Sequence, residues 1–334
     1  MATKETNEIA HPRRILTNMS FWQSPTWLAR TESIYDLTDG ADPEPRGWWS
    51  VAWELFRRRR AYDLVVTEGV RESFAYAWLC RWSRKNPIHI MTEVFIDPPG
   101  RQGWLWKTKN RFYRRLATRA AGIITNSAAE VDTIAERYAY PREKLVFVPL
   151  NTNIADPHLV ASHNGTILSA GRTQRDYALL LKAAREVPAK ITIICGKDDI
   201  PDANPPPNVT IIREIDRDTY LDHLRNAMIV CLPLQRTPRS TGQVVVLEAM
   251  AYGKPVVATR APGTIDYLVD HVNGRLVPPD DATALASVLR ELIEQPGQRD
   301  RLGRQALHDI LDRYLFEHHA ELKLAAFERL CSNA

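Results

Sequence analysis

The sequence predicts an α/β protein with two domains, each built around a parallel β-sheet. Short apolar runs typical of buried parallel strands, such as 62–67 (YDLVVT) and 255–258 (PVVA), alternate along the chain with helical patterns. The 334 residues are enough for two domains of ordinary size. A composition of 44% hydrophobic and 25% charged residues is that of a soluble globular protein.

The first half of the chain is expected to form a sheet from short apolar runs that are separated by helices. The expected strands are 14–18, 35–37, 62–67, 87–93, 122–126 and 145–148. One helix is expected to end at 54–60, where four consecutive arginines would be solvated and complement the helix dipole. A second helix is expected over 71–84, and Ser127 is expected to cap the helix that follows the fifth strand.

A basic segment, residues 98–129, follows the fourth expected strand. It contains seven Lys or Arg residues, two tryptophans and no Asp or Glu. Its central part, 104–122, has the pattern of an amphipathic helix, with Trp104, Phe112 and Leu116 among its apolar members. Such a helix can lie on an anionic bilayer, pack its apolar side on the sheet with a basic face in water, or contact an anionic acceptor.

Composition and charge narrow the functional classes. The net charge of +4 is uneven, because residues 1–150 carry +6 and residues 151–334 carry −2. The basic half contains no recognised nucleic-acid module, which argues against a nucleic-acid partner. No apolar run approaches the length of a membrane-spanning helix, and residues 1–14 lack the apolar core of a signal peptide. The four cysteines are widely spaced without a Cys-x-x-Cys pair, so we expect reduced thiols in a cytoplasmic protein and no zinc site.

The second half repeats the alternation of strands and helices after a polar linker at 151–164. The expected strands are 166–170, 189–195, 208–212, 229–233, 255–258 and 273–278. Asp216 precedes a helix expected at 219–227, so we interpret the sequence Asp216-Arg217-Asp218 as a helix cap and not as a metal-binding Asp-x-Asp. Further helices are expected to continue to about residue 330.

The segment 239–259 (RSTGQVVVLEAMAYGKPVVAT) carries the most specific chemistry. A helix is expected at 244–252, and Gly253 ends it. Free N–H groups and the helix dipole at the start of this helix favour an anion such as phosphate. Glu248 lies among apolar residues, where a carboxylate needs donors; sugar hydroxyls are suitable, and a neighbouring backbone group is the alternative. The loop before the helix consists of the small polar residues Ser240, Thr241, Gly242 and Gln243.

The run from Glu248 to Thr259 resembles the donor-site signature of the family 4 (group 1) glycosyltransferases. This resemblance implies the GT-B architecture, in which two Rossmann-like domains with parallel sheets face each other across a cleft. The family motif has a Glu, seven intervening residues and a second Glu that holds the ribose of the nucleotide-sugar. Glu248 matches the second Glu, whereas Ser240 stands at the position of the first and Gln243 at a usual glycine position.

The resemblance also implies cations for the donor diphosphate. Gly171-Arg172 matches the family's Gly-Arg, Arg175 is the nearest cation to the position of the family's Lys, and Lys197 is a third candidate. Arginine suits this role because its planar fork pairs with two phosphate oxygens. These cations and the helix amides would balance the diphosphate charge, so we expect neither a metal ion nor a cofactor. The predicted nucleotide-sugar site is Arg172, Arg175, Lys197, Ser240, Thr241, Gly242, Gln243 and Glu248.

Catalytic roles are assigned to Glu93 and Arg172. The family commonly has a His at the end of the strand that matches 87–93, and this chain has Glu93 there. A carboxylate at this place can act as an acid–base or electrostatic group; the alternative is a strand-end carboxylate that caps the next segment. Arg172 would stabilise the charge on the leaving diphosphate. His89 alternates inward along the strand and is interpreted as a core residue.

The sequence therefore predicts a glycosyltransferase that moves a sugar from a nucleotide diphosphate donor to a glycan or lipid-linked acceptor. The resemblance implies retention of configuration, and a role in cell-surface polysaccharide or glycolipid synthesis is expected. The predicted parts are an acceptor domain at 1–158, a donor domain at 159–312 and a terminal helix at 313–334 that packs back on the first domain. The expected location is the cytoplasm, with peripheral contact on the inner face of an anionic membrane as an option. Two alternatives stay open: a degenerate GT-B protein that serves as a non-catalytic partner subunit, and a sugar-nucleotide epimerase on the same fold.

Overall fold

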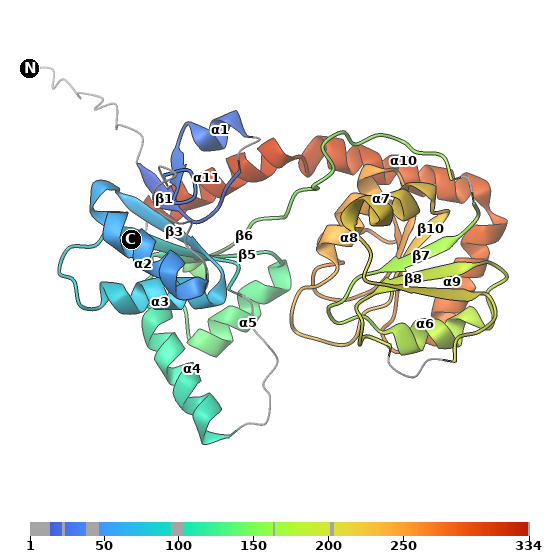
Figure 1. The fold of residues 1–334 in the computed structure, drawn as a ribbon, viewed down its shortest axis with the longest axis horizontal. Coiled ribbons are helices and arrows are strands. Elements are labelled where there is room, and N and C mark those ends of the chain that lie inside the picture. The colour runs from blue at the N-terminus through green and yellow to red at the C-terminus, as the bar shows by residue number, and fades with distance from the viewer. Residues whose placement is uncertain are drawn as a thin grey trace, which may run out of the picture.

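The computed structural model describes residues 14–21, 24–37, 47–94, 103–162, 164–200 and 204–332, and it places them in two bodies that each enclose a sheet (Figure 1). Both sheets have six strands, and every strand pair in them is parallel. The predicted α/β class with two parallel sheets is therefore confirmed. Residues 1–14 were expected to lack a signal peptide; residues 1–13, like residues 98–102 of the basic segment, lie outside the described residues.

The first sheet has the strand order β2-β1-β3-β4-β5-β6. Its central strands are apolar on both faces because helices cover both, which is why they read as continuous hydrophobic runs. The strands are β1 (Ile15–Thr17), β2 (Thr31–Ser33), β3 (Leu64–Glu68), β4 (Ile88–Thr92), β5 (Gly122–Thr125) and β6 (Leu145–Phe147). The helices are α1 (Pro25–Leu28), α2 (Trp48–Arg58), α3 (Val70–Cys80), α4 (Trp104–Ala117) and α5 (Ala128–Tyr138).

The second sheet has the strand order β12-β11-β10-β7-β8-β9. One face packs on α7, α8 and α10, and the other packs on α6 and α9. The strands are β7 (Ile167–Ala170), β8 (Ile191–Cys195), β9 (Val209–Arg213), β10 (Ile229–Leu232), β11 (Val256–Thr259) and β12 (Arg275–Val277). The helices are α6 (Tyr177–Ala184), α7 (Arg217–Asn226), α8 (Gln243–Ala251), α9 (Ala282–Glu294) and α10 (Pro296–Arg313).

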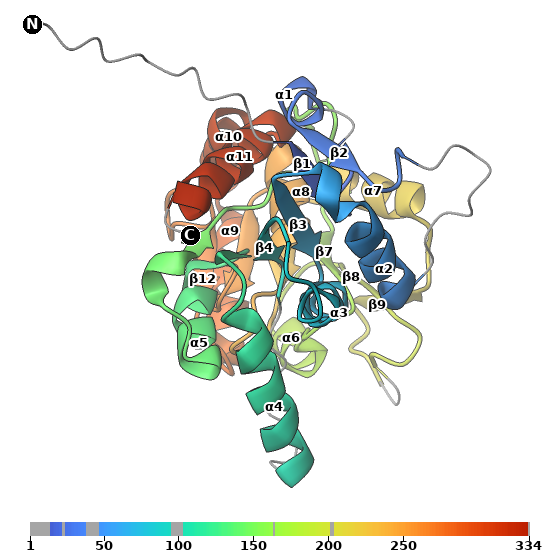
Figure 2. The ribbon, with the colours of Figure 1, turned by 90° about the vertical axis from the view of Figure 1, so that its left-hand side faces the viewer.

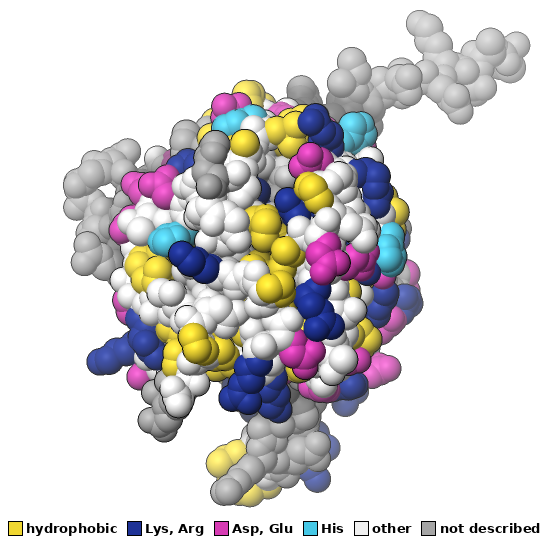
Figure 3. All heavy atoms as spheres, turned by 90° about the vertical axis from the view of Figure 1, so that its right-hand side faces the viewer, with side chains coloured by type: hydrophobic (Ala, Val, Ile, Leu, Met, Phe, Trp, Pro, Cys, Tyr) yellow, Lys and Arg dark blue, Asp and Glu magenta, His cyan; other side chains and the backbone are white. Residues whose placement is uncertain are grey.

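Helix α11 (Phe316–Ser332) follows α10 and returns the end of the chain to the first sheet (Figures 1 and 2). Its buried face, which includes Leu324 and Phe327, packs in one core cluster with Ile90 of β4 and Ile124 of β5. The covered area is apolar and therefore stabilises the packing of the last helix on a sheet that is distant in sequence. The outer face of the second domain instead mixes cationic, anionic and hydrophobic side chains (Figure 3).

One local expectation for the first domain was wrong, and two held only in part. The second strand is β2, at Thr31–Ser33, whereas 35–37 forms a turn in which the N–H of Asp36 donates to the carbonyl of Ser33. Of the four arginines, Arg59 is buried and not solvated, because its guanidinium lies over the ring of Phe56 and bonds to side chains of the segment that follows α3. Ser127 occupies the N-cap position of α5, but its hydroxyl makes no capping hydrogen bond.

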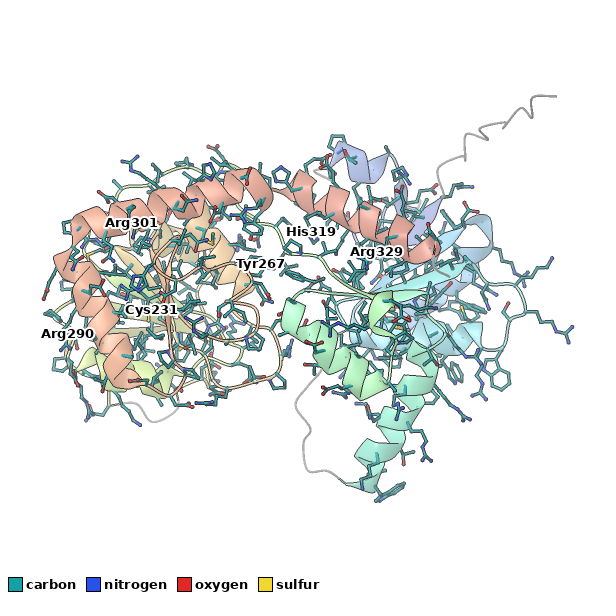
Figure 4. The ribbon with its side chains drawn as sticks, turned by 180° about the vertical axis from the view of Figure 1, so that it is seen from behind. Cys231, Tyr267, Arg290, Arg301, His319 and Arg329 are labelled. Atoms are coloured by element: carbon teal, nitrogen blue, oxygen red, sulfur yellow. The ribbon has the colours of Figure 1, made fainter. Side chains whose placement is uncertain are left out.

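The carboxyl ends of both sheets face each other, and the two domains touch there. The carboxylate of Glu130, in the first turn of α5, accepts hydrogen bonds from Ser240 in the loop before α8. The chain leaving β6 is held from both sides, since Tyr267 Oη accepts from the N–H of Leu150 at 2.8 Å and His319 Nδ1 lies 2.6 Å from the carbonyl of Pro149. Figure 4 shows Tyr267 and His319 on either side of this connection. Ligands of open α/β sheets bind at this edge.

Candidate functional site

A pocket of about 320 Å³ lies at the carboxyl edge of the second sheet. It is built from the ends of β7 and β8, the start of α7 and the first turns of α8, which the parallel topology brings to one place. Two of its lining residues, Arg172 and Glu248, are predicted site residues. The lining residues are Ala170, Gly171, Arg172, Ile194, Cys195, Ile215, Asp216, Arg217, Tyr220, Val244, Val245 and Glu248.

Glu248 is the buried carboxylate of this pocket, with only 1% of its surface exposed. The hydroxyl of Tyr220 donates to its Oε2 at 2.7 Å, and Nη1 of Arg217 lies 2.9 Å from its Oε1. The arginine contact is an ion pair without hydrogen-bond geometry, so among the described residues Oε1 accepts no hydrogen bond. A buried carboxylate oxygen that accepts no hydrogen bond favours a ligand with a hydroxyl group that can donate one.

Arg217 and Tyr220 were not singled out from the sequence. Both lie on α7, where Asp216 caps the helix by accepting from the N–H of Thr219 at 2.9 Å, which confirms the predicted cap. Burial and the charge of Glu248 raise the pKa of Tyr220 well above its ordinary value, so this side chain stays a hydrogen-bond donor. The pattern around Asp216 indicated where α7 begins but not that its first turns face α8.

The three cationic residues predicted to bind the donor diphosphate do not all lie at the pocket. Arg172 lines the pocket, is largely exposed, and bonds to Glu214 Oε2 at 3.0 Å. Arg175 lies behind the turn, where its Nε and Nη1 donate to the carbonyls of Ala170 and Thr173 at 3.0 and 2.8 Å. Lys197 is exposed and is not among the lining residues, although its N–H donates to Glu214. The structure therefore brings only Arg172 of these three to the pocket, together with Arg217.

Gly171 is required by the packing of this turn. Its φ of 127° lies in the region that favours glycine, and a Cβ there would lie 2.3 Å from the guanidinium of Arg175. Arg175 thus supports the turn that presents Arg172, and burial lowers its pKa from the ordinary value. This supporting role, which the sequence did not indicate, fits the two carbonyl bonds that the guanidinium makes.

The loop before α8 is buried between the domains. Ser240, Thr241 and Gln243 are each about 5% exposed, and Gly242 has a φ of 90° that places it at the N-cap. No side chain caps this helix, which leaves its first-turn N–H groups without a capping partner. Val244 and Val245, at the start of α8, line the pocket, whereas the four predicted loop residues do not.

A pair of carboxyl groups lies at the facing edge of the first sheet. Glu68 ends β3, and Glu93 follows β4 with a left-handed φ of 55°. Burial and the negative charge and hydrogen bond of Glu93 raise the pKa of Glu68 to about 7, although the ammonium of Lys323 opposes the shift. Lys323 comes from α11 and is 1% exposed. Two adjacent carboxyl groups, one of them titrating near neutral pH, are suited to proton transfer. Glu68 was missed because its partner is 25 residues away.

His89 has the properties expected of a core residue. Its Nε2 lies 2.9 Å from Thr67 Oγ1, and its ring packs edge-on against Tyr76 at 4.7 Å. Burial lowers its pKa to about 3, so the imidazole is neutral near pH 7. It therefore has no positive charge to offer to a substrate at the edge of the sheet.

Helix α4 projects from the first domain (Figure 2) and exposes aromatic and cationic residues side by side. Trp104 is 74% and Leu105 66% exposed, which is unusual for large apolar side chains. On one side of α4, Arg111, Arg114 and Arg115 line a hollow of about 510 Å³. On the other side lies a pocket of about 450 Å³, here named the tryptophan pocket, lined by Trp48, Trp49, Arg71, Phe74, Ala75, Trp78, Phe112 and Tyr113. None of the described helices is long and apolar enough to cross a bilayer.

Two family models match the chain, one on each domain. The model described as "Glycosyl transferases group 1" matches residues 152–309, and the "Glycosyl transferase 4-like domain" matches residues 22–151. The chain is 30% identical over 142 residues to a D-inositol 3-phosphate glycosyltransferase of Kribbella flavida, which is 42% of this chain and 31% of that protein. It is 26% identical over 238 residues to the MMP alpha-(1->4)-mannosyltransferase of Mycolicibacterium hassiacum, which is 65% of this chain and 56% of that protein. The matches thus span less than two thirds of each relative's length.

The fold has close counterparts among solved structures. The Anabaena protein HepE in complex with UDP-glucose superimposes with a TM-score of 0.70 at 17% identity, over 96% of this chain and 100% of that one. A likeness at this identity shows the fold, with two Rossmann-like domains in the GT-B arrangement.

Proposed function

Because this chain belongs to the group 1 glycosyltransferases, we propose that it transfers a sugar from a nucleotide diphosphate donor to a glycan or lipid-linked acceptor. The observation that carries the proposal is the buried Oε1 of Glu248 in the second-domain pocket, which pairs with the charge of Arg217 but accepts no hydrogen bond from the described residues. A ribose hydroxyl supplies a hydrogen-bond donor. The structure of HepE with UDP-glucose supports a nucleotide-sugar as the ligand class, because its backbone matches this chain in both domains.

The donor diphosphate would lie between the pocket cations and the start of α8. Arg172 and Arg217 each have a carboxylate partner, Glu214 and Glu248, that holds the guanidinium at the pocket wall. Negative charge grows on the leaving diphosphate during the reaction, and fixed cations together with the first-turn N–H groups of α8 stabilise it. This arrangement requires no metal ion, and it is compatible with the retention of configuration that the family implies.

The acceptor would bind at the facing edge of the first domain. Glu93 and Glu68 lie there, and one of this pair would take the proton that the acceptor hydroxyl loses. The exposed apolar and cationic residues of α4 and the tryptophan pocket favour an acceptor held at an anionic membrane, as in glycolipid or cell-surface polysaccharide synthesis. The protein would then act at the cytoplasmic face as a peripheral enzyme.

The donor proposal is tested with a panel of nucleotide-sugars. A true donor should raise the melting temperature of the protein, because it binds the native state alone. Arg172→Ala should weaken donor binding by about 30-fold, corresponding to about 2 kcal/mol for a lost charge-assisted contact, as measured by calorimetry. Activity should persist in EDTA.

Arg225→Ala is the matched control, since Arg225 pairs with Asp222 on the exposed side of α7. If Arg172→Ala binds the donor as the wild type does, Arg217 or another cation holds the diphosphate. Loss of activity in EDTA that manganese or magnesium restores would contradict the metal-free site. A protein that no nucleotide-sugar stabilises would argue for the non-catalytic subunit, and release of an altered nucleotide-sugar would argue for the epimerase.

Membrane contact is tested by cosedimentation with phosphatidylglycerol vesicles and with phosphatidylcholine vesicles. The wild type should sediment with the anionic vesicles and come off at high salt, because each Lys or Arg near the surface adds about 1 kcal/mol within a Debye length. Replacing Arg111, Arg114 and Arg115 by Gln should abolish sedimentation and leave donor binding unchanged. The control triple variant replaces Arg290, Arg301 and Arg304 of the second domain by Gln in the same way, and it should sediment as the wild type does (Figure 4 labels Arg290 and Arg301). If the wild-type protein does not sediment with anionic vesicles at low salt, contact with an anionic membrane is ruled out.

A further inference from the structure

A cluster of buried polar side chains joins the two domains at the start of α8. Asn126, Ser127 and Glu130 reach it from the end of β5 and the first turn of α5, and Ser240 and Thr241 reach it from the loop before α8. All five are at most 8% exposed. Oε1 of Glu130 accepts from the N–H of Ser240 at 3.0 Å and from its hydroxyl at 2.7 Å. The cluster therefore brings a carboxylate of the first domain onto a loop of the second.

Three atoms of this cluster lack a hydrogen-bond partner among the described residues. They are Oδ1 of Asn126, Oγ of Ser127 and Oγ1 of Thr241. Ser127 is at the N-cap position, where a serine hydroxyl ordinarily bonds to the helix, and it does not do so. A buried polar group without a partner is unfavourable, because it has lost its hydrogen bonds to water without replacing them. Three such atoms beside one carboxylate indicate a place for a ligand with several hydroxyl groups.

The cluster lies one helical turn or so beyond the donor pocket. Glu248, which lines the pocket, is five residues after Gln243, and the rise of an α-helix places them about 8 Å apart along the axis of α8. A nucleotide-sugar with its ribose on Glu248 and its diphosphate along the start of α8 would extend toward the first domain. Its sugar would arrive at Glu130, Ser240 and Thr241.

We propose that Glu130 accepts a hydrogen bond from one hydroxyl group of the transferred sugar and does so in place of the carboxylate that this chain lacks at position 240. The inference rests on the proposed donor site and adds the residue that recognises the sugar. A carboxylate has about four acceptor positions. The bonds from Ser240 and from the backbone of Asn126 leave one for a sugar hydroxyl. Because Glu130 belongs to the first domain, it would bind the sugar only when the two domains are in contact.

Burial raises the pKa of Glu130 above the ordinary value for a carboxyl, whereas the hydrogen bonds from Ser240 and from the backbone of Asn126 and the charge of Arg239 act in the opposite direction. The hydrogen bonds that hold Glu130 at the junction therefore also favour the form that accepts from a hydroxyl group.

The test compares a nucleotide-sugar with the nucleotide that lacks the sugar. UDP-glucose with UDP, and GDP-mannose with GDP, serve as probe pairs, and calorimetry gives both affinities. Glu130→Gln should weaken binding of the nucleotide-sugar by about 10- to 100-fold, as expected for hydrogen bonds to a charged group, and leave the nucleoside diphosphate within about threefold. Asp132→Asn is the matched control, because Asp132 lies on the same helix with a largely exposed side chain and should change neither affinity.

A second variant exchanges the two side chains, with Glu130→Ser and Ser240→Glu combined. It should recover most of the lost affinity for the nucleotide-sugar, because it returns a carboxylate to the same junction. Equal weakening of both members of a probe pair by Glu130→Gln would show that Glu130 only ties the domains together. An exchanged variant that melts as the wild type does but binds the sugar as poorly as Glu130→Gln would also overturn the inference. If wild-type protein binds none of the four probes, the proposed donor site itself fails.

Discussion

Replacing Glu93 by glutamine is expected to lower kcat by 100-fold or more while donor binding is retained. General acid–base groups contribute about 10²- to 10⁴-fold, and glutamine keeps the shape of the side chain but cannot accept the proton of the acceptor hydroxyl. Glu93 lies at the carboxyl edge of the first sheet, at the end that faces the second domain. Donor affinity should stay within about twofold by calorimetry, because the proposed donor site is in the other domain.

The pH profile separates this role from a structural one. In the wild type, kcat/KM should rise as the pH passes about 7, because Glu68, whose pKa is raised to about 7, then loses its proton. Glu68→Gln should abolish this inflection, since the substitution removes the group that titrates there. Glu32→Gln is the control, because Glu32 accepts from Tyr62 at the far edge of the first sheet. A profile that Glu68→Gln leaves unchanged would remove the pair from the mechanism.

Glu248→Gln is expected to weaken donor binding by about 10- to 100-fold without unfolding the protein. The substitution removes the charge that holds Arg217 and reduces the strength of the hydrogen bond to a ribose hydroxyl. Tyr220 can still donate to the glutamine oxygen, so the helix pair should remain in place. Calorimetry with UDP-glucose and with UDP measures the effect, and both ligands should lose affinity because both contain the ribose.

The matched control for Glu248 is Glu291→Gln. Glu291 belongs to the same domain and accepts a hydrogen bond from Arg275, with a distance of 2.7 Å between Oε2 and Nη1. It is likewise a carboxylate paired with an arginine, but it is not among the pocket residues. Donor affinity in this variant should equal that of the wild type. Unchanged affinity in Glu248→Gln would take Glu248 out of the site and remove the main support for the donor proposal.

Local sequence patterns accounted well for the second domain. The apolar runs for its strands, the helix ending at Gly253 with its φ of 63° and the Asp216 cap were all predicted, because each depends on residues within one or two helical turns. The first domain was less predictable at its edges. β2 has only three residues, all of them polar, so pairing with β1 decides where it lies.

The candidate site divides in the same way. Short motifs were enough to predict Glu248, Gly171-Arg172 and the loop before α8 as candidate residues, and the structure places Glu248, Gly171 and Arg172, but not the loop, in the pocket. Three contacts became visible in the tertiary structure alone. Arg217 pairs with Glu248, 31 residues away in the chain, and Glu68 lies beside Glu93. Ser240 donates to Glu130, which is 110 residues away. Such pairs depend on which strands are neighbours and on how two domains meet. Those outcomes follow from the packing of apolar surfaces that no local pattern of residues records.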